Sequence, residues 1–490
     1  MIKRALVFAQ LMTSVLLVVG LTVKPTTASD SPEQPNIIFF LADDLGWKDI
    51  GSFGSTFYET PHIDALAAEG MSFLQGYAAS PVCSPTRASI MAGKNPGRMN
   101  TTDWFGAPQP DEVKNHWTRS KPMLPAPYLE HLPLEEVTIA EALKEHGYAT
   151  FFAGKWHLGP TATYWPENQG FDVNIGGHDR GSPPGGYFEP YNNPRMEGKK
   201  EGEHLPMRLA EETSQFIRNN REKPFFAYFS FYSVHNPQQA PYLLVEKYGE
   251  KQKKLGLENT WGVEGERKVR EVQNDSVYAG MVESMDLAVG KVMSTVRRLG
   301  LEEETIVIFM SDNGGLSTSE GHPTSNMPLR AGKGWMYEGG IREPMIIKWP
   351  GVTIPGSATK EAVISMDFYP TILEMAGLPL KPEQHLDGKS LVPLLKGENM
   401  DRGPLFWHYP HYGNQGGSPA SAIRKGPYKL IEFYEDGGYL ELYNISRDIG
   451  EQHNLVDKMP DKVEELYSEL QQWKQEVGAR PPSSNPNAGE

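Results

Sequence analysis

The sequence predicts an α/β protein with a large, mainly parallel mixed sheet flanked by helices, followed by a smaller C-terminal α+β subdomain. Three observations predict it. Short apolar runs alternate with amphipathic helical stretches over residues 35–400, which is typical of a parallel sheet. Several of these runs end in charged or imidazole residues. From residue 401 onward, short strand-like segments with Gly-rich turns replace that alternation.

The N-terminus has the pattern of an export signal. Lys3 and Arg4 precede the apolar stretch Ala5–Leu21, and the small residues Thr26–Ser29 suit a cleavage site. We expect residues 1–29 to be a signal peptide and the mature protein to be periplasmic or secreted; a retained membrane anchor is the alternative. No later stretch approaches the ~18–20 apolar residues of a spanning helix, so no stable membrane insertion is expected after cleavage.

The catalytic domain is predicted to span residues 35–400. Its buried strands are expected at residues 36–41, 148–152, 225–231, 305–310 and 345–348, and its helices at 139–146, 208–220 and 269–298. In open parallel sheets, ligands bind beyond the carboxyl ends of the strands. The polar residues that follow these runs are therefore the candidate site residues.

The C-terminal subdomain is predicted to span residues 401–480. Antiparallel strands are expected at residues 421–424, 428–432 and 439–443, followed by a helix at 461–477. Residues 481–490 are rich in Pro, Ser and Asn, and we expect them to form a disordered tail.

Two acidic pairs follow predicted strands. Asp43-Asp44 comes after the first run, and Asp312-Asn313 comes after the fourth. Clustered carboxylates repel one another unless a cation neutralises them. Oxygen ligands without several Cys or His residues favour calcium or magnesium over zinc, so these pairs predict a site for a hard divalent cation.

Cys83 is the only cysteine of the chain, so no intramolecular disulfide can form. Pro85 suits the first turn of a helix that continues through Met91, which puts Cys83 at a helix N-terminus. The helix dipole there favours a thiolate or a bound anion. Arg87 lies one turn further on. The residue pattern alone leaves two interpretations open: a reactive or anion-binding site, or an ordinary helix with a buried thiol.

Two longer motifs give a specific resemblance. CSPTRASIMAG (residues 83–93) and GYATFFAGKWH (residues 147–157) resemble the two signatures of the type I, formylglycine-dependent sulfatases of the alkaline phosphatase superfamily. The resemblance extends from about Asn36 to Val477, with one departure at Lys94, where Arg is commoner in the family. It implies an alkaline phosphatase-like fold.

The resemblance also implies a site. Cys83 would be oxidised to 3-oxoalanine (formylglycine) by a maturation enzyme that reads the Cys-x-Pro-x-Arg core, and Arg87 would hold its hydrate. The groups around the sulfate would be Lys155, His157, His235 and Lys333. The ligands of a calcium ion would be Asp43, Asp44, Asp312 and Asn313, with the modified Cys83 nearby.

The implied chemistry is hydrolysis of a sulfate ester. One hydroxyl of the aldehyde hydrate attacks sulfur with Asp312 as base, and His235 gives a proton to the leaving alcohol. The second hydroxyl then loses its proton to His157, so that sulfate is expelled and the aldehyde reforms. Calcium and the two lysines favour the charge that develops in the transition state.

The substrate is the least specified part of the prediction. We expect exo action on sulfated carbohydrate of the galactose or N-acetylgalactosamine sulfate type, with His178, His408 and His411 on loops that contact substrate. A phosphatase or phosphodiesterase of the same superfamily and a noncatalytic carbohydrate-binding homologue are the alternatives. The formal net charge of −15 makes a nucleic-acid partner a poor expectation.

Overall fold

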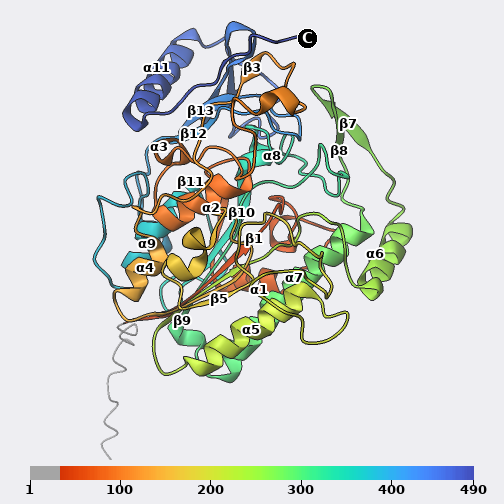
Figure 1. Cartoon of the computed structure of the whole chain (residues 1–490), viewed down its shortest axis with the longest axis vertical. Coiled ribbons are helices and arrows are strands. Elements are labelled where there is room, and N and C mark those ends of the chain that lie inside the picture. Colours follow the sequence, from red (N-terminus) through yellow and green to blue (C-terminus); the bar gives the residue numbers. More distant parts are fainter. Residues whose placement is uncertain (1–33, 490) are drawn as a thin grey trace, which may run out of the picture.

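The protein is described by a computed structural model that covers residues 34–489, so the predicted signal peptide at residues 1–29 lies outside the described residues. An eight-stranded sheet forms its centre (Figure 1). The strands of this sheet are β1 (Asn36–Ala42), β2 (Met71–Tyr77), β4 (Ala149–Gly154), β5 (Val173–Ile175), β6 (Phe225–Ser230), β9 (Thr305–Ser311), β10 (Arg342–Lys348) and β11 (Ser357–Ile364).

The strand order is β11-β2-β10-β9-β1-β6-β4-β5. Only β10 runs antiparallel to its neighbours β2 and β9; the other pairs are parallel. The predicted mainly parallel mixed sheet is therefore confirmed. Strands β1, β4, β6 and β9 are neighbours in parallel, so their carboxyl ends meet at one edge.

Strand β1 shows why the apolar runs form central strands. All of its residues are buried, and its side chains alternate between two hydrophobic cores, with Phe39 in one and Phe40 in the other. A strand of a parallel sheet that is covered on both faces needs such a continuous apolar run.

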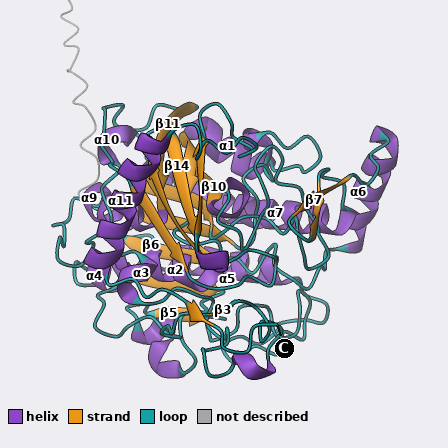
Figure 2. Ribbon diagram, turned by 90° about the horizontal axis from the view of Figure 1, so that it is seen from above, coloured by secondary structure: helices purple, strands orange, loops and turns teal. Residues whose placement is uncertain are grey.

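Helices cover both faces of the sheet (Figure 2). The helices on one core are α1 (Pro61–Glu69), α5 (Leu205–Asn219) and α7 (Ser276–Arg298), and those on the other are α2 (Cys83–Ala92), α4 (Ile139–Lys144) and α9 (Phe368–Met375). Besides the helix of the C-terminal subdomain, the remaining helices are α3 (Pro96–Met99), α6 (Tyr242–Leu255), α8 (Glu338–Ile341) and α10 (Val392–Leu395). None of the helices within residues 34–489 has both the length and the apolar character that a membrane crossing requires.

The helix expected at residues 269–298 begins later than predicted. Residues Arg267–Arg270 form β8, which pairs with β7 (Trp261–Glu264) in an antiparallel hairpin. Helix α7 then starts after Asp275, whose carboxylate accepts hydrogen bonds from the backbone N–H groups of Val277 and Tyr278, each at 2.9 Å. An Asp in the N-cap position satisfies donors that the helix itself cannot, which fixes this start.

The C-terminal residues form a second, antiparallel sheet, of which β12 and β13 are labelled in Figure 1. Its strand order is β12-β13-β14-β15. These strands are β12 (Leu405–Tyr409), β13 (Ala420–Lys425), β14 (Tyr428–Phe433) and β15 (Tyr439–Asn444). Helix α11 (Pro460–Val477) packs on this sheet through Leu466, Leu470 and Trp473. The predicted antiparallel sheet and helix are thus present.

The tail that we expected to be disordered contains one paired segment. Ser483–Ser484 form β16, which pairs with β3 (Met123–Leu124). The Asn485 side-chain amide donates hydrogen bonds to the carbonyl oxygens of Arg119 and Lys121, each at 2.8 Å. Composition alone does not reveal this pairing, because its partner lies far away in the sequence.

Candidate active site

The acidic pairs and the basic residues of the prediction meet at one edge of the central sheet. Asp43 and Asp44 follow β1, and Asp312 follows β9, its parallel neighbour. On the other side of β1 lie β6, which precedes His235, and β4, which precedes Lys155. The parallel directions of these four strands therefore bring the polar residues after them to the same place.

Consecutive carboxylates would normally point to opposite faces of a strand. Asp44 leaves the strand with φ 61°, in the left-handed region that Asp tolerates better than most residues. Ligand atoms of Asp43, Asp44 and Cys83 consequently lie within 4.8 Å of one another, and all three residues are buried.

The buried carboxylates of Asp43 and Asp44 are each paired with the ammonium group of a buried lysine. Lys155 Nζ lies 2.8 Å and 2.9 Å from the two carboxylate oxygens of Asp43. Lys333 Nζ lies 2.7 Å and 2.8 Å from the two oxygens of Asp44. Such pairing offsets the high cost of taking a charge out of water.

Arg87 supplies the third pair. Its Nε donates to Asp312 Oδ2 at 2.8 Å, and its Nη2 lies 2.7 Å from the same oxygen. Its Nη1 donates to the Lys155 carbonyl at 2.9 Å and to Ser230 Oγ at 2.7 Å. The guanidinium thus links the ends of three strands, and it fixes the Asp312 carboxylate relative to Lys155.

Burial and the charged neighbours move the pKa values of the two aspartates in opposite directions. Burial, reinforced by Asp312 and Asp44, raises the pKa of Asp43 to about 8 despite Lys155. Burial alone would also raise the pKa of Asp44, but Lys333, His235 and Lys155 outweigh it and hold the pKa below its usual value. The second buried carboxylate beside Asp43 therefore makes its charged form costlier, and Lys155 offsets part of that cost.

Cys83 begins α2, as predicted, and every residue of this helix is buried. Burial raises the pKa of its thiol to about 12, although Lys155 and Lys333 oppose the shift. The expected helix-terminus effect therefore does not produce a thiolate at neutral pH, because the thiol is only 3% exposed.

The two histidines present defined ring nitrogens. His157 Nε2 lies 3.0 Å from the Phe105 carbonyl; because a carbonyl only accepts, Nε2 carries the proton. Its Nδ1 is buried without a hydrogen-bond partner among residues 34–489. His235 Nδ1 donates to the Asn236 carbonyl at 2.9 Å, and its Nε2 lies 3.8 Å from Asp44 Oδ2.

Both imidazoles are held neutral by their surroundings. Burial, aided by Lys155, lowers the pKa of His157 well below its usual value. Burial and Lys333 lower the pKa of His235 to about 4, although Asp44 opposes the shift.

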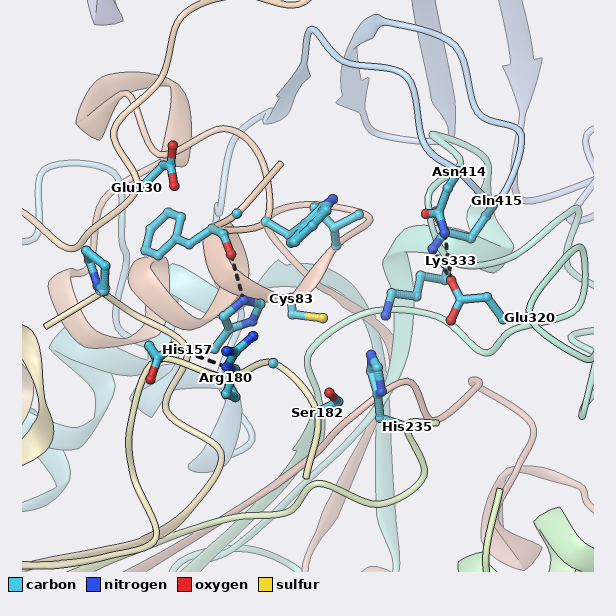
Figure 3. Close-up of a pocket in the computed structure, with 18 residues that line it drawn as sticks. Cys83, Glu130, His157, Arg180, Ser182, His235, Glu320, Lys333, Asn414 and Gln415 are labelled. Atoms are coloured by element: carbon cyan, nitrogen blue, oxygen red, sulfur yellow. Dashed lines mark hydrogen bonds and ion pairs between the residues drawn. The ribbon is translucent and has the colours of Figure 1, made fainter. Parts of the chain in front are cut away.

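A cavity of about 590 Å³ opens onto this cluster. Figure 3 shows Cys83, His157, His235 and Lys333 around its inner part. Its walls include Trp104 and the charged side chains of Glu130, Asp179, Arg180 and Glu320. The cavity is therefore lined by charged and polar side chains as well as by aromatic rings, which suits a polar small molecule.

One wall was not predicted from the sequence. Glu320 Oε1 accepts hydrogen bonds from Asn414 Nδ2 at 3.0 Å and from Gln415 Nε2 at 2.8 Å. Its Oε2 accepts one from Asn236 Nδ2 at 3.1 Å. Glu320 thus joins the loop after β9, the loop after β6 and the β12–β13 loop of the C-terminal subdomain (Figure 3). None of these residues directly follows a predicted strand, so no local signal marks them.

The three histidines expected on substrate loops do not line this cavity. His178 is buried, with Nδ1 3.2 Å from Asp179 Oδ1 and Nε2 3.3 Å from the Tyr232 hydroxyl. His408 bonds within the C-terminal subdomain, to Ser421 Oγ at 2.7 Å and to the Arg480 carbonyl at 2.9 Å. His411 lines a neighbouring cavity instead. Their contact with substrate stays a prediction.

Comparison with known proteins agrees with the fold and the site. The sulfatase family model matches residues 35–378, and that of the N-sulphoglucosamine sulphohydrolase C-terminal region matches residues 331–477. A sulfatase of Formosa agariphila is 33% identical over 94% of this chain and 93% of its own length. Arylsulfatase A of Homo sapiens is 31% identical, over 89% of this chain and 86% of its own length.

Further relatives show the same relationship. N-acetylgalactosamine-6-sulfatase of Mus musculus is 32% identical over 82% of this chain and 72% of its own length. Among solved structures, Ps i-CgsB superimposes with a TM-score of 0.72 at 28% identity, covering 93% of this chain and 94% of that one. The chain therefore belongs to the sulfatase family and is an enzyme that hydrolyses sulfate esters.

Proposed function

We propose that this enzyme releases sulfate by exo action from sulfated carbohydrate of the galactose or N-acetylgalactosamine sulfate type, with calcium and a 3-oxoalanine formed from Cys83. The observation that carries the proposal is the cluster itself: ligand atoms of Asp43, Asp44 and Cys83 lie within 4.8 Å of one another. Lys155 and Lys333 are bonded to the same two carboxylates.

The residues present fit a calcium ion. Asn313 Nδ2 donates to Asp44 Oδ1 at 2.8 Å, which leaves Asn313 Oδ1 buried and without a hydrogen-bond partner in the described part of the chain. An orphaned amide oxygen beside three carboxylates is a set of hard oxygen donors, which calcium prefers. Asp43, Asp44, Asp312 and Asn313 would hold the ion. Bound there, calcium would polarise the sulfate group, and the hydrate of 3-oxoalanine would supply the attacking hydroxyl.

The chain's own residues have separate tasks in this reaction. Lys155 and Lys333 bind the sulfate oxygens, because their ammonium groups lie at the cluster where the ester must sit. Arg87 holds the Asp312 carboxylate, the proposed base, in one orientation. His235 would give a proton to the leaving alcohol from Nε2, since its Nδ1 is bonded to Asn236; because the free enzyme holds this imidazole neutral, Nε2 has to gain that proton when the anionic ester binds. His157 has only Nδ1 left to accept the second proton.

The carbohydrate substrate is supported by two relatives. One is named an N-acetylgalactosamine-6-sulfatase, and Ps i-CgsB was crystallised with k-i-k-neocarrahexaose. Membership of the sulfatase family favours sulfate over phosphate esters, which argues against the phosphatase alternative. A noncatalytic carbohydrate-binding protein is disfavoured by the intact set of Cys83, Arg87, Lys155, His157, His235 and Lys333.

We propose that Cys83 is oxidised before the chain folds, because α2 in the folded protein is buried along its whole length. We also propose that the maturation enzyme reads the extended segment around Cys83 and that the chain is exported through residues 1–29 to the periplasm or the medium. N-terminal sequencing of the mature protein tests the export: a start shortly after Ser29 is expected, and a start at Met1 contradicts it.

Mass spectrometry of the tryptic peptide 49–87 tests the modification. Conversion of the Cys83 thiol to an aldehyde makes this peptide about 18 Da lighter. We expect the lighter peptide, together with sulfate release, when the chain is produced beside a maturation enzyme. Sulfate release by protein whose peptide keeps the mass of the free thiol would contradict the proposed nucleophile.

A further inference from the structure

A second cavity adjoins the catalytic one. It has a volume of about 250 Å³ and shares two lining residues, Trp104 and Asn414, with the cavity that leads to Cys83. Its walls come from the loops that follow α3 and β12. Trp104 and Asn414 therefore form the boundary between the two cavities.

Aromatic side chains dominate this second cavity. Trp104 keeps 39% and Trp117 keeps 38% of their surfaces exposed, which is unusual for the largest apolar side chains. His116 and Trp117 lie with ring centroids 5.5 Å apart, and Tyr412 also lines the cavity. Exposed aromatic faces suit the C–H faces of a sugar ring, because they offer a broad apolar surface that loses little conformational freedom on binding.

A few polar groups accompany the rings. His411 is 1% exposed, and its Nε2 lies 2.8 Å from Thr102 Oγ1. Its Nδ1 has no hydrogen-bond partner within residues 34–489 and lies 3.4 Å from Asp103 Oδ2. A buried ring nitrogen without a partner carries a cost unless a ligand or water meets it. Aromatic faces with a sparse set of polar atoms are the chemistry that recognises a sugar with its hydroxyl groups.

We propose that this second cavity is a subsite for the sugar unit next to the sulfated one. The sulfated unit would lie in the catalytic cavity, Trp104 would contact both units, and Trp117 would contact only the neighbouring unit. The substrate would therefore be an oligosaccharide of at least two units. This inference rests on the proposed carbohydrate sulfatase function and adds the length of the substrate to it.

The variant Trp117→Ala tests the subsite, because Trp117 lines only the second cavity. The probes are 4-nitrophenyl sulfate and, for the sulfated sugar that gives the fastest release, its monosaccharide and its tetrasaccharide. We expect KM for the tetrasaccharide to rise about tenfold, as for an aromatic hot-spot residue. Turnover of 4-nitrophenyl sulfate and of the monosaccharide should stay as in the wild type.

Trp261→Ala is the matched control, because Trp261 is 40% exposed and lies in β7, outside the linings of both cavities. Equal values of KM for the tetrasaccharide in the wild type and Trp117→Ala would overturn the subsite. The subsite would also be overturned if Trp117→Ala lost the same share of activity on all three probes, or if Trp261→Ala showed the same rise in KM for the tetrasaccharide. Sulfate release from no probe at all would instead count against the proposed function.

A binding measurement keeps the test independent of turnover. In native gels that contain the sulfated polysaccharide from which that tetrasaccharide is prepared, we expect the wild type to migrate more slowly than in plain gels and Trp117→Ala to lose most of that retardation. Equal retardation of the two proteins, or none for either, would overturn the inference.

Discussion

Lys155 Nζ lies between the two carboxylate oxygens of Asp43, at 2.8 Å and 2.9 Å, and neither side chain is exposed to solvent. The lysine follows β4 and the aspartate follows β1, so the pair spans the strand that lies between them, β6. The pair supports both the stability of the site and its chemistry, since the same ammonium group is proposed to bind sulfate.

Lys155→Met should strongly destabilise the protein in the absence of metal. Removing one partner of a buried ion pair leaves an uncompensated charge, which costs about 3–5 kcal/mol. Calcium should recover part of this loss, because the ion would neutralise Asp43 in place of the lysine. Urea unfolding with EDTA and with calcium measures both effects.

Lys144→Met is the control for this experiment. Lys144 Nζ lies 2.7 Å from Asp172 Oδ1, and the two side chains are 48% and 41% exposed. A pair of this kind contributes about 0–1 kcal/mol. Equal losses in the two variants, or no response of Lys155→Met to calcium, would contradict the account.

Gly181→Ala should disturb His157 without touching the cation cluster. A Cβ atom at Gly181 would lie 2.5 Å from His157 Cε1 and 2.7 Å from Nδ1, closer than real Cβ contacts. The ring would have to move and lose its bond to the Phe105 carbonyl. We expect kcat to fall at least about tenfold, as for a misplaced proton acceptor, with unchanged calcium affinity.

Gly249→Ala serves as the comparison, because a Cβ atom at this position on α6 meets nothing within 4 Å. Its kcat should equal that of the wild type. If Gly181→Ala had the same kcat as the wild type, the position of the His157 ring would not matter for turnover.

Glu320→Ala should weaken substrate binding more than it slows the chemical step. The carboxylate accepts hydrogen bonds from Asn236, Asn414 and Gln415, so its loss frees two loops at once. Hydrogen bonds to a charged group contribute about 1.5–3 kcal/mol each, so we expect KM to rise about tenfold or more. Glu320→Gln keeps one carbonyl oxygen, so its KM should lie between those of the wild type and Glu320→Ala. Steady-state kinetics in which kcat falls and KM is unchanged would contradict this positioning role.

Asp286→Asn should change how stability depends on pH. Asp286 Oδ1 accepts hydrogen bonds from the backbone N–H groups of His62 and Ile63 at the start of α1. Burial raises the pKa of Asp286 from 3.8 to about 7, although these bonds oppose the shift. Between those values the folded state holds a proton that the unfolded state has lost, so the stability of the wild type falls as pH rises.

Asparagine keeps a carbonyl oxygen for both backbone donors and does not titrate. The free energy of unfolding of Asp286→Asn, relative to that of the wild type, should therefore increase as pH is raised from about 4 to about 7. Urea unfolding at a series of pH values measures the difference. A difference that stays constant across this range would mean that the Asp286 carboxyl ionises normally in the folded protein.

The core of the site could be predicted because apolar runs reveal where strands end. Asp43, Lys155 and Asp312 directly follow such runs, and neighbouring parallel strands then bring them together. Glu320 and Gln415 could not be found in this way. They meet only because the β12–β13 loop packs beside the loop after β9, a contact between distant parts of the sequence.

His408 illustrates the opposite difficulty. A histidine among aromatic residues on a predicted loop suggested a contact with sugar, but the residue lies on β12. Both of its ring nitrogens bond inside the C-terminal subdomain, to Ser421 and Arg480. The sequence shows that an imidazole is present, but not which partners already satisfy it.

The most direct measurement of the central claim is sulfate release by the matured wild type and by Cys83→Ala, in calcium and in EDTA, with 4-nitrophenyl sulfate and sulfated galactose or N-acetylgalactosamine. We predict release by the wild type with calcium, a large loss in EDTA, and no release by Cys83→Ala under either condition. Release by Cys83→Ala at the rate of the wild type would contradict the claim that Cys83 and the adjoining carboxylates form the catalytic centre.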